Sequence, residues 1–427
     1  MSMGAGHAAV VGAGPAGEAA TWALLAAGWR VSVFDEQPRP GGNIGRIRRN
    51  APATPLERGD DRLHLHQGAR VLRVDGDGTV EYRGRGGITA PRFDGIVLAC
   101  GAYDLHTPIP GTPAPGVCSA GALQALMKGQ GVVPAGRVMI AGAGPFLYVA
   151  AAGLLRAGAQ VTTVVDRLGM HDYARLAPLG IHATGDALAF ARDQALLRRH
   201  GVRLLCGHRL ETVEDGHAVL DDGERLAFDR LGLTEGFAAQ SQLARTAGCE
   251  LRWHEPGGYF VTVTDEWGRS SVPGVLVCGE GQGVRGWRHA RVSGELAAHA
   301  LLADREGQVT DATRYRRLLR RRARFARFGE ALERMIATGR ERPAAEAVLC
   351  ACESVPAAEV EAAADLRLQD LSSIKVVTRC GMGPCQGRYC EPHVARCIER
   401  AGGRPRGALN QRGLTRPVTA GELAHDS

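Results

Sequence analysis

The sequence lacks several features that would assign it to other classes of protein. Among its 427 residues, no stretch of about 18 apolar residues could form a membrane span. Its N-terminus, MSMGAGHAAVVGAGPAG, has neither the basic segment nor the cleavage site of a signal peptide. The net charge is +7, but no aromatic-plus-basic module of the kind that binds nucleic acid is present. We therefore expect a cytoplasmic protein that has no transmembrane segment and does not bind nucleic acid.

Length and glycine content indicate several nucleotide-binding domains. A chain of 427 residues is too long for one ordinary domain. It contains 58 Gly, well above the usual share of about 7%. Such an excess suits an α/β protein whose tight turns approach phosphate groups closely. In the cytoplasm, clustered Cys more often hold metal than form disulfides.

The first motif is VVGAGPAG, in which Gly12, Gly14 and Gly17 follow a predicted strand at 7–11 and precede a predicted helix at 18–27. The first glycine permits the turn, the second lets backbone amides reach a pyrophosphate, and the third brings the helix against the strand. A second strand ends 23 residues after the first glycine, in adjacent acids. Either acid could accept a ribose hydroxyl, because strand ends are uncertain by a residue or more.

Three later segments decide which dinucleotide is expected: the glycine pair in PRPGGN and two predicted strands that end in ACG near residue 100 and in GE near residue 280. Together with the first motif they resemble the disulfide-reductase-like flavoproteins, where the late segment ends in Gly-Asp and the carboxylate accepts a ribityl hydroxyl; here the acid is one methylene longer. A plain NAD domain leaves the late segment unexplained, so we predict FAD. The predicted FAD-binding residues are Gly12, Gly14, Pro15, Ala16, Gly17, Asp35, Glu36, Gly41, Gly42, Val71, Ala99, Cys100, Gly101, Gly279 and Glu280.

Residues 137–166 repeat the strand, turn, helix and strand, which predicts a second nucleotide-binding-type domain. Gly142 and Gly144 match the motif, but Leu147 occupies the third glycine position, where it would hold the helix away from the strand or redirect the loop. Asp166 could still receive a ribose hydroxyl. Three interpretations stay open: a working NADH site, a site for an adenine nucleotide (ATP or NAD) without hydride transfer, and an emptied relic. The altered phosphate contact favours the last two.

Cysteine residues gather near the C-terminus. Cys350 and Cys352 form CxC, and Cys385 and Cys390 follow after 32 intervening residues. Four thiolates satisfy a [2Fe-2S] cluster, and each short pair is expected to hold one iron from a local turn. All-cysteine zinc sites, the alternative, favour CxxC pairs. We predict a [2Fe-2S] cluster on these four residues, with Cys380 beside the cluster and not a ligand.

The expected fold is α/β, with two dinucleotide-binding domains followed by a small helical [2Fe-2S] module. Eight Arg between Arg314 and Arg327, interrupted by apolar residues, predict a basic amphipathic helix that is either an ordinary linker or a partner-docking surface. The expected boundaries are 1–108 with 264–304 for the FAD domain, 109–263 for the second domain, 305–345 for the linker helix, 346–400 for the [2Fe-2S] module and 401–427 for a tail.

With these segments the chain resembles the FAD-containing α (A) subunits of heteromeric bacterial amino-acid dehydrogenases, such as opine oxidase, D-hydroxyproline dehydrogenase and hydrogen cyanide synthase. The resemblance is carried by LTEGFAAQSQLARTAGCE, by the RPVTAGEL tail and by CACESVPAAEV with KVVTRCGMGPCQGRYC, which looks like a bacterioferritin-associated-ferredoxin-like module. It implies two partners: a D-amino-acid-oxidase-like flavoprotein β subunit that oxidises the C–N bond, and a small ferredoxin-like γ subunit.

The resemblance also implies a role in relaying electrons between a partner flavin, the cluster and this chain's FAD. No His or Tyr can be named as a catalytic base, so the catalytic residues are unknown from the sequence; His289 is a conceivable flavin neighbour. Two alternatives stay open. One is a stand-alone NADH-dependent flavin and iron-sulfur reductase, and the other is a scaffold that its cofactors only stabilise.

Overall fold

A computed structural model of the chain describes most of its residues. None of the helices in these parts is both long and apolar enough to cross a membrane. The described residues are 6–46, 52–105, 107–176, 178–179, 184–307, 311–340, 342–409 and 413–423.

The first domain is built on a parallel five-stranded sheet in the order β20–β7–β1–β2–β3. Alternate residues of β1 enter different cores: Ala8 and Val10 pack with α1 and α8, whereas Ala9 and Val11 pack with the antiparallel strands β4 and β5. A sheet buried on both faces explains why its strands are short apolar runs. The elements are β1 (His7–Val11), α1 (Pro15–Ala26), β2 (Arg30–Asp35), α2 (Pro55–Arg58), β3 (Leu63–Gln67), β4 (Arg70–Val74), β5 (Val80–Gly84), β6 (Gly87–Thr89), β7 (Gly95–Leu98), β20 (Val275–Val277) and α8 (Trp287–Glu306).

The second domain repeats this plan with the parallel order β12–β11–β10–β16–β9. Val138 and Ile140 of β10 face a helical layer, and Met139 and Ala141 face the antiparallel strands β13–β15. The elements are β9 (Val117–Ser119), α3 (Ala120–Ala125), a π-helical turn (Leu126–Gln130), β10 (Arg137–Gly142), α4 (Phe146–Arg156), β11 (Gln160–Asp166), α5 (Met170–Arg175), α6 (Thr184–Arg199), β12 (Arg203–Cys206), β13 (Leu210–Glu214), β14 (His217–Leu220), β15 (Arg225–Ala227) and β16 (Arg230–Thr234).

The chain crosses between the two domains twice, and the crossings pair with each other. Strand β8 leaves the first domain, β17 returns to it, and the two form an antiparallel pair. Strand β20 then completes the first sheet beside β7, although it follows the whole second domain in the sequence. The connecting elements are β8 (Ala102–Asp104), β17 (Phe237–Ala239), α7 (Gln242–Thr246), β18 (Leu251–His254), β19 (Tyr259–Thr262) and a 3-10 turn (Gly279–Gln282).

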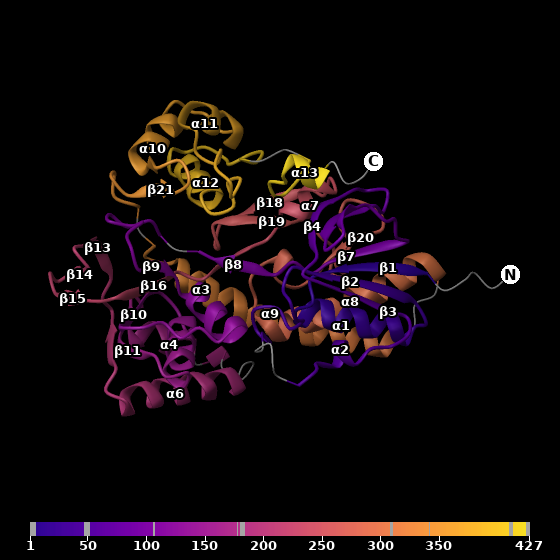
Figure 1. Ribbon diagram of the computed structural model, residues 1–427, viewed down its shortest axis with the longest axis horizontal. Helices are drawn as coiled ribbons and strands as arrows, with labels where there is room; N and C mark the ends of the chain where they lie inside the picture. Colours follow the sequence, from indigo (N-terminus) through magenta and orange to yellow (C-terminus); the bar gives the residue numbers. More distant parts are fainter. Residues whose placement is uncertain are drawn as a thin grey trace.

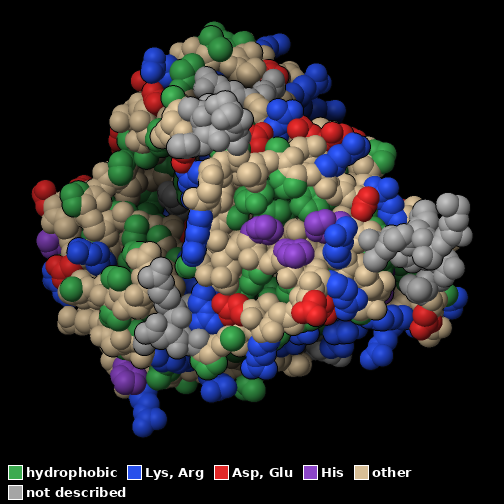
Figure 2. All heavy atoms as spheres, turned by 45° about the vertical axis from the view of Figure 1, so that its right-hand side comes forward, with side chains coloured by type: hydrophobic (Ala, Val, Ile, Leu, Met, Phe, Trp, Pro, Cys, Tyr) green, Lys and Arg blue, Asp and Glu red, His purple; other side chains and the backbone are tan. Residues whose placement is uncertain are grey.

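The basic segment forms α9 (Ala312–Ala337), whose N-terminus is capped by the Asp311 carboxylate. Residue 305, the predicted start of the linker, instead lies in the last turn of α8. The apolar stripe of α9 includes Tyr315 and Leu318 and packs on α8, while basic side chains occupy its solvent face. Figure 2 shows basic side chains gathered along the lower edge of one face of the molecule.

The cysteine module, residues 346–400, lies above both sheets in Figure 1. Its core continues into the body of the protein, because Phe260 of β19 and Trp253 of β18 pack with it. The following residues return to the first domain, where the Thr415 N–H donates to the Leu72 carbonyl (2.9 Å). The elements are β21 (Val348–Cys350), β22 (Val355–Pro356), α10 (Ala357–Asp365), α11 (Leu371–Thr378), α12 (Glu391–Arg400) and α13 (Ala420–Leu423).

The predicted fold class is confirmed, with two Rossmann-type parallel sheets and a helical C-terminal region. The repeated glycine turns identified this class because each marks a strand that feeds directly into a helix.

Candidate functional site

The first glycine turn joins β1 to α1 and has no room for side chains. Gly12 has a φ of 103°, and a Cβ atom there would lie 2.4 Å from the Ala99 carbonyl oxygen. A Cβ atom on Gly17 would lie only 1.8 Å from the Gly12 carbonyl oxygen. Helix α1 begins immediately, at Pro15, and its first turn offers unpaired backbone N–H groups. This cradle fits a dinucleotide pyrophosphate.

Of the two acids that end β2, Asp35 is the one that contacts the turn. Its carboxylate accepts hydrogen bonds from the N–H groups of Ala13 (2.6 Å) and Gln37 (2.7 Å). Burial raises the pKa of Asp35, and these two hydrogen bonds oppose the shift. Glu36, whose side chain is 41% exposed, instead forms an ion pair with Arg70 (3.5 Å). Asp35 is therefore the better placed of the two to receive a ribose hydroxyl.

The glycine pair at Gly41 and Gly42 lies directly against the turn. The Gly41 N–H donates to the Ala13 carbonyl (2.8 Å), and a Cβ atom on Gly42 would lie 2.9 Å from the Gly14 Cα. Arg46 completes this wall: burial lowers its pKa, while nearby acids oppose that shift. An arginine here could balance phosphate charge, and no motif in the sequence indicated it.

The late segment reaches α1 through its backbone. A Cβ atom on Gly279 would lie 3.0 Å from the Ala16 Cβ. The Glu280 carboxylate accepts hydrogen bonds from the N–H groups of Arg285 (2.8 Å) and Gly286 (3.2 Å). Burial raises the pKa of Glu280 to about 7. Glu280 is thus held by its own loop.

The remaining predicted flavin residues occupy less polar surroundings. The Val71 side chain is buried in the core of the first domain. Cys100 follows β7, and burial raises the pKa of its thiol to about 12. The carbonyl of Gly101, a residue with a φ of 73°, accepts a hydrogen bond from the Gln240 N–H (3.0 Å). His289 is buried in the first turn of α8, and burial lowers its pKa to about 3, so its ring is neutral.

The second glycine turn is filled by side chains of the chain itself. Leu147 is fully buried in the core beneath β10. The buried Asp166 accepts hydrogen bonds from the Tyr173 hydroxyl (2.5 Å) and from the Gly144 N–H (3.3 Å). A Cβ atom on Gly144 would lie 2.8 Å from the Ile336 side chain of α9. Tyr173 therefore occupies a hydrogen bond that a ribose hydroxyl would make, and Ile336 lies over the turn.

The two turns also follow different paths. Gly142 keeps the first position, since a Cβ atom there would lie 1.7 Å from the Thr234 carbonyl oxygen. However, the strand-end acid bonds to the N–H of Gly144, whereas the first turn uses Ala13, one position earlier in the motif. This shift is of the kind expected from a bulky residue at the third glycine position. Burial raises the pKa of Asp166 to about 6.

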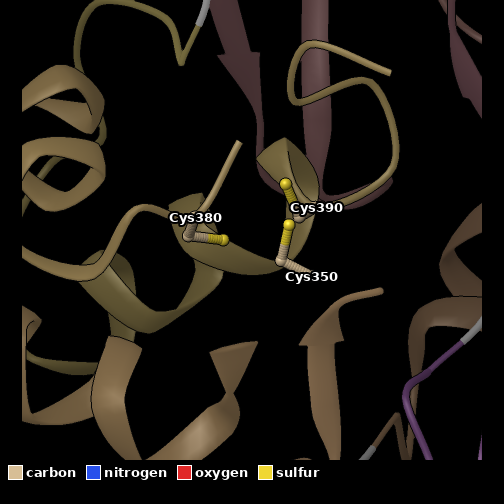
Figure 3. A group of neighbouring side chains, drawn as sticks. All are labelled: Cys350, Cys380 and Cys390. Atoms are coloured by element: carbon tan, nitrogen blue, oxygen red, sulfur yellow. The ribbon is translucent and has the colours of Figure 1, made fainter. Parts of the chain in front are cut away.

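Cysteines of the cysteine module form a group of three and a separate pair. The sulfur atoms of Cys350, Cys380 and Cys390 lie within 4.8 Å of one another, and Figure 3 shows the three side chains as neighbours. Hydrogen bonds from Cys380 and Cys390 lower the pKa of Cys350 to about 2. A thiolate among further sulfur donors is the donor set that iron or zinc requires. Cys380 thus lies closer to the predicted ligands than its sequence position suggested.

The other two cysteines form a second group. Burial raises the pKa of Cys352, whose thiol also interacts with Cys385. The thiols therefore associate across the module, Cys350 with Cys380 and Cys390, and Cys352 with Cys385. The hairpin β21–β22 places the CxC segment against the later loop, where Cys352 lies beside Gly383, and the assignment of each short pair to one iron stays a prediction.

Sequence reasoning missed three side chains at these sites, namely Arg46, Tyr173 and Ile336. Each arrives from outside a motif: the first follows the glycine pair, the second lies in α5, and the third lies near the end of α9. The sequence predicted a basic amphipathic helix at α9, but no motif indicated that its apolar face meets the second turn.

Comparisons with known proteins agree with this architecture. The family model of pyridine nucleotide-disulphide oxidoreductases matches residues 6–300. The A subunit of opine oxidase from Agrobacterium tumefaciens (strain Ach5) is 32% identical, over 97% of this chain and 91% of its own length. The HcnB subunit of hydrogen cyanide synthase from Pseudomonas protegens is 29% identical, over 92% of each protein.

Solved structures show the same fold. The crystal structure of L-proline dehydrogenase from P. horikoshii superposes with a TM-score of 0.68 at 19% identity, and the match covers 98% of this chain and 79% of that chain. The resemblance inferred from the motifs is confirmed by the match to the A subunits of opine oxidases. The chain belongs to the pyridine nucleotide-disulphide oxidoreductase family and, within it, to the group that contains these opine oxidase subunits.

Proposed function

We propose that this chain is the electron-transfer flavoprotein subunit of a multi-subunit dehydrogenase that oxidises an amino acid or an N-substituted amino acid. Its relatives are named as subunits of opine oxidase and of hydrogen cyanide synthase, which supports both a multi-subunit assembly and a substrate with a C–N bond. The expected companion is a D-amino-acid-oxidase-like flavoprotein β subunit. The substrate class covers opines, hydroxyproline and glycine.

FAD is the cofactor that the first site fits. The glycine turn and the N-terminus of α1 would bind its pyrophosphate, and Asp35 would accept a ribose hydroxyl. Gly41 and Gly42 would cover the phosphates, because they already lie against the turn without side chains. Arg46 would offset phosphate charge from the same side.

A [2Fe-2S] cluster is the group that the cysteine module fits best. The two cross-module pairs would supply two thiolates to each iron, with Cys350 and Cys390 on one and Cys352 and Cys385 on the other. When bound, a flavin exchanges one or two electrons and a [2Fe-2S] cluster exchanges one, which suits a relay between a two-electron substrate and another carrier.

The grouping of the Cys350, Cys380 and Cys390 sulfurs, in a module whose core includes Phe260 of β19, carries this proposal. The alternative of an NADH-dependent reductase receives less support, because Tyr173 and Ile336 occupy the second turn. The other two interpretations of the second turn, an adenine-nucleotide site without hydride transfer and an emptied relic, both stay open.

The test is to copurify the chain with its β-type companion and to add candidate opines and amino acids. We expect iron and acid-labile sulfide at two each per chain, and substrate-dependent electron paramagnetic resonance of a reduced cluster in the complex but not in this chain alone. A complex that turns over substrate without any iron would contradict the proposal. Persistence of turnover after Cys385→Ser, with the cluster lost, would favour the scaffold alternative.

A further inference from the structure

One arginine connects the cysteine loop to the flavin domain. Arg388 lies between Cys385 and Cys390, and its backbone N–H donates to the Cys385 carbonyl (3.2 Å). Its guanidinium donates a short hydrogen bond to the side-chain oxygen of Gln240. The same group lies over the ring of Tyr103, 5.4 Å from the ring centroid. Arg388 therefore belongs to the cysteine loop by its backbone and to the body of the protein by its side chain.

Gln240 carries this connection to the predicted flavin site. Its side-chain N–H donates to the carbonyl of Cys100 (2.9 Å), and its backbone N–H donates to the carbonyl of Gly101 (3.0 Å). The residue before them, Ala99, supplies the carbonyl against which Gly12 packs. An unbroken path of covalent and hydrogen bonds thus joins the Cys385 backbone to the loop behind the first glycine turn.

Arg388 is not required simply to attach the module. Other contacts attach it, including the ion pair of Arg245 with Glu391 and the hydrogen bond from Trp253 to Glu399 (2.9 Å). These contacts use carboxylates, whereas Arg388 forms no ion pair within the parts of the chain that the structure describes, and its buried Nε has no hydrogen-bond partner there. The guanidinium therefore lies between the cysteine loop and the loop that follows β7 without a carboxylate bonded to it among the described residues.

We propose that Arg388 is a positioning residue whose fixed positive charge raises the electron affinity of both cofactors. This inference rests on the proposed function. A cation beside a redox centre stabilises the negative charge that reduction adds, and protein groups around iron-sulfur clusters and flavins tune their potentials in this way. Gln240 and the Tyr103 ring hold that charge at one place, because a guanidinium can donate a hydrogen bond and stack on an aromatic ring at the same time.

The test compares Arg388→Gln with Arg388→Lys in the full chain carrying its cofactors. Gln is neutral but can still hydrogen-bond to Gln240, so it removes mainly the charge, whereas Lys keeps the charge. The measurement is a dye-coupled redox titration of the flavin and cluster absorbance. We expect Arg388→Gln to shift the oxidised-to-reduced ratio at a fixed potential about tenfold toward the oxidised form. That shift corresponds to about 59 mV for the one-electron couple.

Arg388→Lys should recover most of this shift, which a merely structural loss would not allow. Arg342→Gln is the matched control, because Arg342 lies just before the module, is 65% exposed and pairs with Glu361 of α10; the potentials of this variant should equal those of the wild type. If the Arg388→Gln protein loses its cofactors, the titration is done with Gln240→Met, which keeps the Arg388 charge but removes its hydrogen-bond partner. We expect this variant to shift the potentials in the same direction by a smaller amount.

Wild-type potentials in an Arg388→Gln protein with full flavin and iron would overturn the inference. A failure of the proposed function can be told apart from a failure of this inference, because the wild-type chain itself would then lack iron or flavin. If only the cluster is missing, the flavin titration still decides whether Arg388 affects the flavin.

Discussion

Arg245 of α7 donates to both carboxylate oxygens of Glu391 in α12, at 3.1 and 3.4 Å. The Glu391 side chain is 7% exposed, and it also accepts the N–H of Leu409 (3.2 Å). This ion pair joins the cysteine module to the helix that packs on the antiparallel strands of the first domain. A partly buried, two-pronged pair of this kind constrains orientation as well as distance.

Removing one member of this pair should destabilise the protein. Glu391→Gln leaves Arg245 without a counter-charge in a largely buried position, and we expect the free energy of unfolding to fall by about 3 kcal/mol. Denaturant unfolding measures the change. The control is Glu361→Gln, which breaks the pair with the exposed Arg342 and should cost less than about 1 kcal/mol. Equal effects of the two changes would contradict the importance assigned to the Arg245 pair.

Gly17→Ala should reduce flavin binding and stability together. The added Cβ atom would meet the Gly12 carbonyl oxygen at 1.8 Å, so either the turn or α1 must move. We expect a loss of about 2 kcal/mol in unfolding free energy and a clear fall in FAD per chain, measured by absorbance. Gly86→Ala, where nothing lies within 4 Å of the new atom, serves as the control and should change neither.

The four predicted ligands should be separable from Cys380 by substitution. Serine at a ligand position should abolish iron binding, measured as iron per chain and as visible absorbance, whereas Cys380→Ser should retain iron with an altered spectrum because its sulfur borders the group. Cys118→Ser, in the second domain, is the control. Full iron loss in Cys380→Ser together with retention in any of the other variants would require a different ligand set. The variants that should lose iron are Cys350→Ser, Cys352→Ser, Cys385→Ser and Cys390→Ser.

NADH should not bleach the flavin rapidly, because the second turn is occupied. Replacing Leu147 with a smaller residue should not create NADH-dependent reduction of the flavin, since Leu147 is part of the core of the second domain. Leu147→Ala should instead lower the unfolding free energy by about 3 kcal/mol. Leu188→Ala, at a position 64% exposed on α6, should have little effect. Stopped-flow absorbance of the flavin with NADH tests the first statement, and fast reduction by the wild-type chain would support the reductase alternative.

His289 should make the protein less stable in mild acid. Burial lowers its pKa from 6.5 to about 3, so below pH 6.5 the unfolded chain binds a proton that the folded chain does not. Stability therefore falls as the pH falls through this window, by about 2 kcal/mol at pH 5 from this group alone. His289→Gln does not titrate and should lose less stability between pH 7 and pH 5. Parallel pH profiles of the two proteins would show that His289 is not buried as a neutral ring.

The two parallel-sheet domains can be predicted from the sequence, because each glycine turn requires a backbone conformation and a close approach that side chains would prevent. The cysteine module was also evident from the sequence, since Cys350 with Cys352 and Cys385 with Cys390 lie close together along the chain. The glycine turns and the cysteine pairs are local features, because each is formed by residues that are close together in the sequence.

Tertiary structure alone decided the relationships between distant segments. Whether Asp35 or Glu36 meets the turn depends on how β2 is oriented in the sheet. The covering of Gly144 by Ile336 joins residues from different domains, as does the hydrogen bond between Arg388 and Gln240. No local pattern predicts such contacts, because they depend on the packing of α9 and the cysteine module against the two sheets.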